Sequence, residues 1–317
     1  MSANDRYVNN LELFLLKVQA DNATKQSTLL AADYADVLEG SVHDFEPEVE
    51  TPKFASGSFD QAATVVGKQG ASATLRYPLR SHGDGNTPDF FAALECADFT
   101  IDNTLDYFRA KPSSGGGKSG TLWGYEGKQG TTNVHKISNW KPNWKITGSS
   151  GQMVTIEFVG NCAHDNYESA TAPTVTKVRT KIPAFINATV LINNFAYKVL
   201  EFEIDGGQTH DLTNDPTAAN GCGQNIMTDR EIQLTAKVYM QNAGTVNPIA
   251  ALKAGTEGAV ELYWGPDDQI KVDAAYSQII DAKRSDQNGV KCWDLTLKLN
   301  RNDFALLVLG FDGTTGE

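Results

Sequence analysis

Most of the chain alternates between apolar and polar residues, and this period of two is the pattern of a β-strand with one buried face. Clusters of Gly, Ser, Asn and Asp separate these runs and indicate turns. We expect strands at residues 11–18, 46–51, 75–79 and 123–125, a hairpin over 139–159, two strands within 189–204, and further strands at 259–264, 272–282, 291–299 and 304–309. The sequence therefore predicts a mainly β protein.

One short helix is expected in the first half of the chain. The segment Thr87-Pro88-Asp89 predicts a helix over residues 89–97, with Thr87 as the N-cap and Pro88 at the first helical position. Its apolar residues fall on one face, which should pack on a sheet: Phe90, Phe91 and Leu94.

A second helix is expected at the matching place in the other half. Asn247-Pro248 gives the same kind of start, Ile249 and Leu252 occupy the apolar positions, and Gly255 ends the helix.

The two helices belong to a longer repeat. The strand-like segments 73–79 and 234–240 align at an offset of 161 (234 − 73), and the Ala-Ala-Leu segments that follow align at 158 (250 − 92). A third pair, 154–158 after Gly151 and 295–299 after Gly289, follows in the same order. Three matches in one order favour a duplicated domain, although chance similarity between amphipathic strands stays open.

The repeat predicts two tandem domains. They are residues 1–170 with an N-terminal arm and residues 171–317 with a C-terminal tail, and the polar segment 163–181 is expected to link them. Each would be a β-sandwich or half-barrel with one flanking α-helix, extended by arms and loops such as the Gly/Ser-rich segment 113–120.

The charge is acidic in both halves, and the net value is −12. Residues 1–170 carry 14 Lys and Arg against 21 Asp and Glu, or −7, which leaves 13 (27 − 14) against 18 (39 − 21), or −5, for residues 171–317. No basic stripe is present, so a protein that grips nucleic-acid phosphates is not expected. No run of about 18 apolar residues exists, so no membrane span is expected either.

Candidate chemistry is sparse. The segment 116–119 lacks the glycine that a phosphate-binding loop needs five positions before its last glycine, since Pro112 is there. Two carboxylates for glycoside chemistry could come from Asp267-Asp268 and from Glu46, Glu48 and Glu50, but acidic strand faces are common. We expect no enzyme: no catalytic, cofactor-binding or metal-binding residue is predicted, and no cofactor.

Histidines and cysteines give no site at this stage. The histidines lie in or beside polar stretches, without metal-ligand spacing, and are expected to be solvated loop residues: His43, His82, His135, His164 and His210. The four cysteines are far apart and are expected to be reduced thiols, partly in the core: Cys96, Cys162, Cys222 and Cys292.

Tryptophans support one alternative. Trp140 and Trp144 are four residues apart, so on one strand they share a face. They are expected in the core or at a subunit contact, but with Trp264 they also allow a two-domain β-sandwich that binds glycans, as in a receptor-binding protein.

Taken in order, several segments resemble the tail tube (major tail) proteins of long-tailed bacteriophages. They are Leu13-Phe14-Leu15-Leu16-Lys17, a polar arm, residues 42–51, the strand 71–79, the helix 89–97, the Gly/Ser loop, the hairpin 144–160 with Gly148 and Gly151 at its turn, Ile226-Met227-Thr228-Asp229-Arg230, and residues 286–299. The order of the segments carries the resemblance, and the family has no catalytic signature to transfer.

The resemblance implies a structural virion protein that assembles with itself. Three two-domain chains would form a ring of six pseudo-equivalent domains, and rings would stack into a tube that conducts genomic DNA during ejection. Implied partners are the tape measure, tail terminator and tail tip proteins, with double-stranded DNA passing through the lumen without specific binding and no membrane. The protein would be assembled in the host cytoplasm and located in the virion tail tube.

Two further expectations follow from the resemblance. An acidic lumen wall would let DNA pass, and the strand around Pro47 with its flanking glutamates is one candidate for that wall. The sixfold symmetry would be approximate, because the loops differ by three residues, the Gly/Ser segment occurs only in the first copy, and the second copy lacks a counterpart of Trp140.

Overall fold

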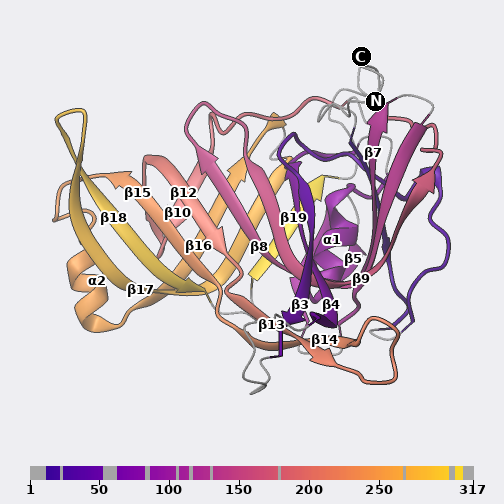
Figure 1. Cartoon of the computed structure of the whole chain (residues 1–317). Helices are drawn as coiled ribbons and strands as arrows, with labels where there is room; N and C mark the ends of the chain where they lie inside the picture. Colours follow the sequence, from indigo (N-terminus) through magenta and orange to yellow (C-terminus); the bar gives the residue numbers. More distant parts are fainter. Residues whose placement is uncertain are drawn as a thin grey trace, which may run out of the picture.

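The computed structural model of the chain describes residues 12–21, 24–52, 63–82, 86–104, 107–113, 117–128, 131–177, 180–266, 269–299 and 304–309. Within these ranges the protein is mainly β with large antiparallel sheets, as predicted, and contains two short α-helices (Figure 1). No helix in these ranges is long and apolar enough to cross a membrane.

The first half of the chain supplies nine strands and one helix. They are β1 (Leu13–Val18), β2 (Tyr34–Ala35), β3 (Val42–Glu50), β4 (Val65–Pro78), α1 (Phe90–Cys96), β5 (Phe99–Thr104), β6 (Tyr107–Pro112), β7 (Gly120–Lys128), β8 (Thr131–Ser149) and β9 (Thr155–Ala170), with a 3₁₀ turn at Ala31–Asp33. The expected strand at 123–125 is the middle of the longer β7, and the segment 163–170, expected to be linker, is the end of β9.

The second half supplies ten strands and one helix. They are β10 (Thr189–Ile192), β11 (Phe195–Ala196), β12 (Val199–Asp205), β13 (Gln208–Asn214), β14 (Cys222–Arg230), β15 (Gln233–Tyr239), α2 (Pro248–Ala254), β16 (Glu257–Trp264), β17 (Ile270–Gln287), β18 (Val290–Leu299) and β19 (Phe304–Leu309). β13 and β14 form a separate hairpin, and the other strands belong to one 17-stranded sheet.

Neighbouring strands follow the same order in both halves. In the first half the order is β3–β4–β9–β8–β7–β1–β2, and in the second it is β12–β15–β18–β17–β16–β10–β11. The extra elements differ: β5 and β6 follow α1 in the first half, whereas the β13–β14 hairpin lies between β12 and β15 in the second.

Two strand pairings join the sheets of the two halves. β12 pairs with the C-terminal part of β8, and β19 pairs with β6, both antiparallel. The core continues across these joints, because the ring of Trp144 on β8 lies 5.4 Å from that of Phe99 on β5 and 5.1 Å from that of Phe304 on β19. The chain therefore folds as one body with a single main core.

The first helix, α1, has the predicted apolar face but not the predicted N-cap. Phe90, Phe91 and Leu94 are buried where α1 packs on β1, β5 and β8. The expected Thr87 cap is wrong: Asp89 is the N-cap, so α1 begins at Phe90, two residues later than expected. The N–H of Phe91 bonds to the carbonyl of Pro88 at 3.0 Å.

The second helix begins and ends as predicted. The Asn247 Oδ1 accepts a hydrogen bond from the Ala250 N–H at 3.0 Å, and Gly255 has a left-handed φ of 60° at the C-cap.

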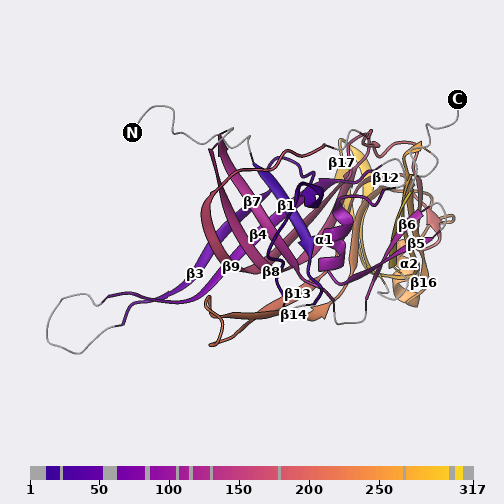
Figure 2. The same ribbon diagram turned by 90° about the vertical axis from the view of Figure 1, so that its right-hand side faces the viewer.

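Two hairpins leave the body of the sheet. β3 and β4 run outward together as a long ribbon, and β13–β14 turns below the first half (Figure 2). Most of the loop expected at 52–61 lies outside the described residues, as do 114–116 of the Gly/Ser segment.

Candidate assembly surfaces

The joint between β8 and β12 carries charged residues on its solvent-facing side. Five residue pairs face each other across it, from Glu201 opposite Ser149 to Asp205 opposite Lys145. The Lys145 Nζ lies 3.0 Å from Glu203 Oε1 and 3.3 Å from Asp205 Oδ2. The strand register thus brings one lysine of the first half between two carboxylates of the second.

These contacts favour the charged forms of Lys145 and Asp205 and shift their pKa values accordingly. The hydrogen bond to Glu203 is the main reason that the pKa of Lys145 is raised, with Asp205 adding to it. Desolvation disfavours ionisation of Asp205, but hydrogen bonds from Asn143 and the Gly207 N–H, together with Lys145, hold its pKa below the ordinary value.

The strands that correspond to β12 and β8 in the repeat lie at the outer ends of the sheet. In the described part of the chain β3, the counterpart of β12 in the strand order, pairs with β4 alone. The C-terminal part of β17, the counterpart of β8, pairs along 279–287 with β18 alone. Each of these strands therefore presents one edge of backbone N–H and C=O groups that has no strand partner among the described residues.

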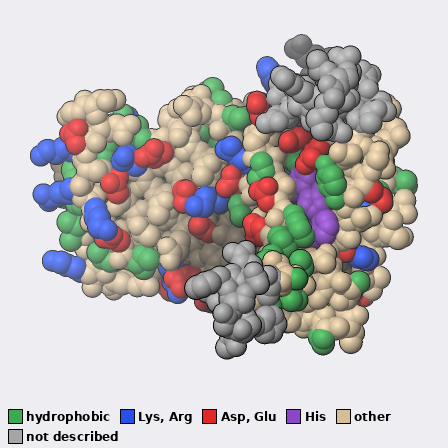
Figure 3. All heavy atoms as spheres, in the orientation of Figure 1, with side chains coloured by type: hydrophobic (Ala, Val, Ile, Leu, Met, Phe, Trp, Pro, Cys, Tyr) green, Lys and Arg blue, Asp and Glu red, His purple; other side chains and the backbone are tan. Residues whose placement is uncertain are grey.

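One face of this sheet is mostly polar and hollowed, with Val42 and Val159 as exposed apolar residues on it. A shallow hollow on it is bounded by residues of β8, β12, β15, β17 and β18. Acidic and basic side chains lie interspersed on the same side of the molecule in Figure 3. Alternation along the strands places these charges on one face: Asp44, Glu46, Glu157, Glu201, Glu203, Asp205, Asp281 and Asp294, with Arg76, Lys145, Lys237, Lys283 and Lys298.

This face is mildly acidic, and its cations are paired. Five basic and eight acidic residues give −3 (5 − 8). Each of the five basic side chains lies within ion-pair distance of a carboxylate, from 2.5 Å for Lys283–Asp281 to 3.3 Å for Lys298–Glu231. Because their charges are offset locally, these cations offer little attraction to a phosphate backbone.

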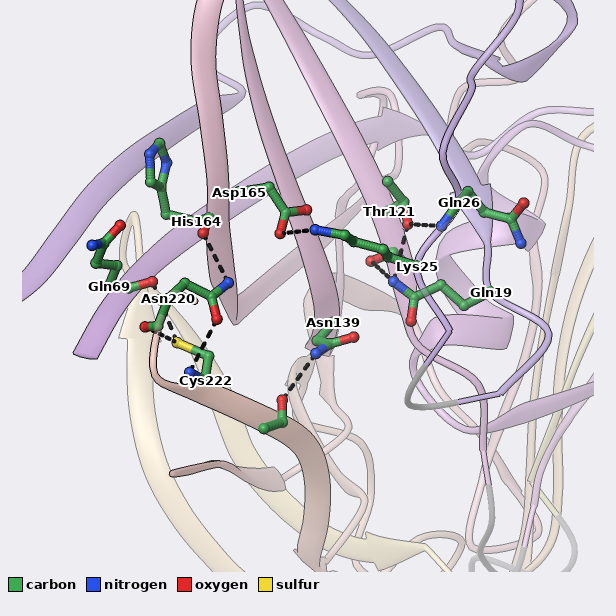
Figure 4. A network of polar contacts seen from close by, with 12 residues as sticks. Gln19, Lys25, Gln26, Gln69, Thr121, Asn139, His164, Asp165, Asn220 and Cys222 are labelled. Atoms are coloured by element: carbon green, nitrogen blue, oxygen red, sulfur yellow. Dashed lines mark hydrogen bonds and ion pairs between the residues drawn. The ribbon is translucent and has the colours of Figure 1, made fainter. Parts of the chain in front are cut away.

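The β13–β14 hairpin fastens the second half to the first through amide side chains. The fully buried Asn225 donates from Nδ2 to the carbonyls of Asn139 (3.1 Å) and Asn161 (2.7 Å). Asn139 in turn donates to the Gly223 carbonyl at 2.9 Å, and Asn220 donates to the His164 carbonyl at 2.9 Å (Figure 4). Backbone groups of two strands that do not pair with β14 are satisfied in this way.

A buried ion pair lies beside this hairpin. Lys141 on β8 and Asp98 after α1 are 3.0 Å apart between Nζ and Oδ1, with 3% and 1% of their side chains exposed. Lys141 also donates to the carbonyl of Gly117 at 3.2 Å. A Cβ on Gly117 would lie 1.2 Å from Asp98 Oδ1, so only glycine lets the loop close over the pair.

Three histidines, from β3, β8 and β9, lie together inside the first half, contrary to the expectation of solvated loops. The rings of His43 and His164 lie 4.8 and 5.0 Å from that of His135, and His135 Nε2 is 2.8 Å from His164 Nδ1. Glu126 Oε1 lies 3.1 Å from His43 Nε2. Burial, followed by the charges that its two histidine neighbours would carry, lowers the pKa of His135 to about 4.

The other two histidines differ from each other. His210 lies on β13, and burial, followed by Lys141 and Arg230, lowers its pKa to about 4. His82 lies outside the helices and strands, as expected, with its Nε2 3.7 Å from Asp89 Oδ1. No cluster of three or more His, Cys, Asp or Glu with metal-binding geometry occurs in the ranges that the structure describes.

Burial settles the roles of the tryptophans and thiols. Trp140, Trp144 and Trp264 are at most 1% exposed, so they belong to the core and none forms a solvent-facing platform for a sugar. All four cysteines are free and buried, as expected for core thiols. Of the candidate acids, Glu46, Glu48 and Glu50 are exposed on β3, whereas Asp267 and Asp268 lie outside the described residues, as does Gly116.

Strand edges and buried amides are the features that the sequence did not indicate. A strand that will pair at its edge has the same alternating pattern as one that will not, and Lys145, Glu203 and Asp205 look like ordinary surface residues. No protein-family model matches the chain, and a search of curated proteins finds no significant match.

Proposed function

We propose that this chain is the subunit of a tail tube of a long-tailed bacteriophage, a structural protein that assembles with itself. It would contain two tandem copies of one β-sandwich or half-barrel unit, residues 1–170 and 171–317, each with a flanking helix. Three chains would close a ring of six pseudo-equivalent units. The identical order of strand neighbours in the two halves supports the duplication.

The register of the paired strands also supports the duplication. Leu75 faces Phe158 in the first half, and Ala236, which is 161 residues beyond Leu75, faces Leu295 in the second. Leu295 therefore takes the position of Phe158, an offset of 137 (295 − 158). The third sequence match, which aligned Phe158 with Leu299, was displaced by four residues along the strand.

The single observation that carries the proposal is the β8–β12 joint. Within one chain, an edge strand of the second unit completes the sheet of the first. The corresponding edges, β3 and the end of β17, lack a strand partner within the described chain. Repeating the same joint between chains would use both open edges, and a rotation that returns to its start closes a ring rather than an open filament.

The polar face of the sheet fits the wall of a DNA conduit. In a closed ring the continuous sheet would turn this hollowed, mildly acidic face toward the axis. DNA carries one negative charge per about 1.7 Å of helix axis, so a wall without unpaired cations would not retain it. The duplex would pass without specific binding, while tape measure, terminator and tip proteins would contact the tube's interior and ends.

The proposal is tested by negative-stain electron microscopy of the purified chain at several concentrations, with mass photometry of the same samples. Rings of three chains, or tubes with a regular axial repeat, are the expected result. A uniform monomer at every concentration would contradict it.

A further inference from the structure

The β8–β12 joint inside the chain indicates which residues would face each other if two chains met in the same way. It is antiparallel, and its outermost pair, Lys145 opposite Asp205, is an ion pair at 3.3 Å. If the two halves are copies of one unit, the residues at the matching positions of β3 and β17 are fixed by the strand registers. This inference rests on the proposed ring and adds to it the register of the contact between chains.

The first position follows from β3 and β12. Val42 faces Thr74 in the first half, and Glu203 faces Thr235 in the second. Both strands therefore align at 161 (203 − 42 and 235 − 74). At this offset Asp44 is the counterpart of Asp205 (205 − 161 = 44), and both are acidic.

The second position follows from β8 and β17. Lys145 faces Glu157, and Lys283 faces Asp294. Since Glu157 and Asp294 occupy matching places beside Arg76 and Lys237, Lys283 is the counterpart of Lys145 (283 − 145 = 138). Both are lysines, although no strand in the described residues faces Lys283 on its open edge.

We propose that β3 of one chain pairs antiparallel with the end of β17 of a second copy, with Asp44 opposite Lys283 and Val42 opposite Ser285. Lys283 is 74% exposed and Asp44 is exposed, so both are available in the free chain. The Nζ of Lys283 lies 2.5 Å from a carboxylate oxygen of Asp281, two residues earlier on its own strand. In the joint it would lie between that carboxylate and Asp44, as Lys145 lies between Glu203 and Asp205.

Local features limit the length of this pairing. Beyond Asp44, Glu46 would face Asp281, and like charges in directly opposed positions are unfavourable. Pro47, next on β3, lacks an N–H, and the β3–β4 register shifts between Pro47 and Val49. The pairing should therefore end at Asp44–Lys283, as the internal one ends at Asp205–Lys145.

The joint between chains should also be weaker than the one within a chain. The internal joint is reinforced by the pairing of β6 with β19. β6 belongs to a hairpin that follows α1, whereas α2 leads directly into β16, so the second half has no matching hairpin to offer a neighbour. Rings should consequently dissociate into whole chains.

A charge exchange tests the register. Lys283→Glu places two acids opposite each other at every contact between chains, and Asp44→Lys places two lysines there. Each single variant should raise the protein concentration for half-maximal ring formation about tenfold or more, and the double variant should return it to within about threefold of wild type. Lys298→Glu is the control, because Lys298 is a 54% exposed lysine on the same face but away from both edges, and it should change nothing.

A cross-link gives a second measurement that does not depend on charge. Opposed residues in an antiparallel pair have Cα atoms about 4.5–5.5 Å apart, within the range of a disulfide. Oxidised Asp44→Cys/Lys283→Cys rings should therefore run as covalent multimers on a non-reducing denaturing gel. Asp44→Cys/Gln287→Cys, displaced by four residues or about 13 Å, should not.

The outcomes separate the register from the ring. Wild-type chains that never form rings would overturn the proposed function. Wild-type rings with no rescue by the double charge variant and no Asp44–Lys283 cross-link would overturn the register and leave the ring standing. Preferential cross-linking of the displaced pair would also overturn it. Monomer mass and far-ultraviolet circular dichroism establish that each variant is folded.

Discussion

The buried ion pair Asp98–Lys141 in the first half allows a quantitative test of how burial sets the strength of a charge pair in this fold. Asp98→Asn removes the negative charge and leaves Lys141, 3% exposed, without its carboxylate. Asparagine keeps the backbone preference, because Asp98 has a φ of 60° and Asn adopts this left-handed conformation readily. The variant therefore tests the loss of the charge without a change in backbone conformation.

The magnitude follows from burial. Removing one partner of a buried pair leaves an uncompensated charge and destabilises by about 3–5 kcal/mol. A second pair in the same protein serves as the comparison: Lys25 and Asp165 are 2.9 Å apart, but Lys25 is 60% exposed (Figure 4). Asp165→Asn should cost about 0–1 kcal/mol, since solvent screens such a pair.

The assay is equilibrium urea unfolding followed by tryptophan fluorescence, at concentrations where the chain is monomeric. We expect Asp98→Asn to lower the free energy of unfolding by about 3 kcal/mol or more, and Asp98→Asn/Lys141→Met to recover part of the loss, because it removes the orphaned charge. If Asp98→Asn and Asp165→Asn differed by less than about 0.5 kcal/mol, the reasoning from burial would be refuted.

Three further changes test other parts of the structure. His135 should stay neutral in the folded chain, while in the unfolded chain it takes up a proton below its ordinary pKa of 6.5, so stability falls as pH drops from 6.5 toward 4. Between pH 7 and 5, the free energy of unfolding measured in urea should fall by about 2 kcal/mol less for His135→Gln than for wild type. Equal decreases would contradict this. Asn225→Leu removes the amide that donates to the Asn139 and Asn161 carbonyls. It should cost about 1–3 kcal/mol and speed proteolysis of the β13–β14 hairpin, whereas unchanged cleavage would show that these two bonds do not hold the hairpin. A Cβ at Gly160 would lie 2.5 Å from the Lys141 carbonyl oxygen, so Gly160→Ala should cost about 1–3 kcal/mol. A Cβ at Gly67 would lie 3.6 Å from its nearest neighbouring atom, so Gly67→Ala should be tolerated. Equal effects of the two variants on thermal unfolding would refute the steric argument.

Local patterns in the sequence were sufficient for most of the elements. Alternation indicated most of the long strands but not β5, β6, β13 or β14, which have weaker alternation. Asn247-Pro248 with Gly255 located α2, because caps and turns depend on neighbouring residues alone. The N-cap of α1 was misplaced by two residues: Thr87 is a favoured capping residue, but Asp89 occupies the N-cap position without a side-chain capping hydrogen bond.

Contacts that depend on strand register were beyond such patterns. The three central histidines are far apart in sequence and meet only because β3, β4, β9 and β8 lie side by side in a curled sheet. Lys141 looks like a surface lysine in its strand, yet it is buried because α1 ends beside it with Asp98. The β8–β12 joint likewise requires knowledge of which edges remain open, which alternation does not encode.

The central claim is that this chain closes into a ring through its two open sheet edges. Electron microscopy of assembled wild-type protein, with rotational averaging of end-on particles, tests it most directly. The account predicts rings of three chains with threefold symmetry and a sixfold arrangement of similar units. Only monomers, or rings whose averages show no sixfold arrangement of units, would contradict it.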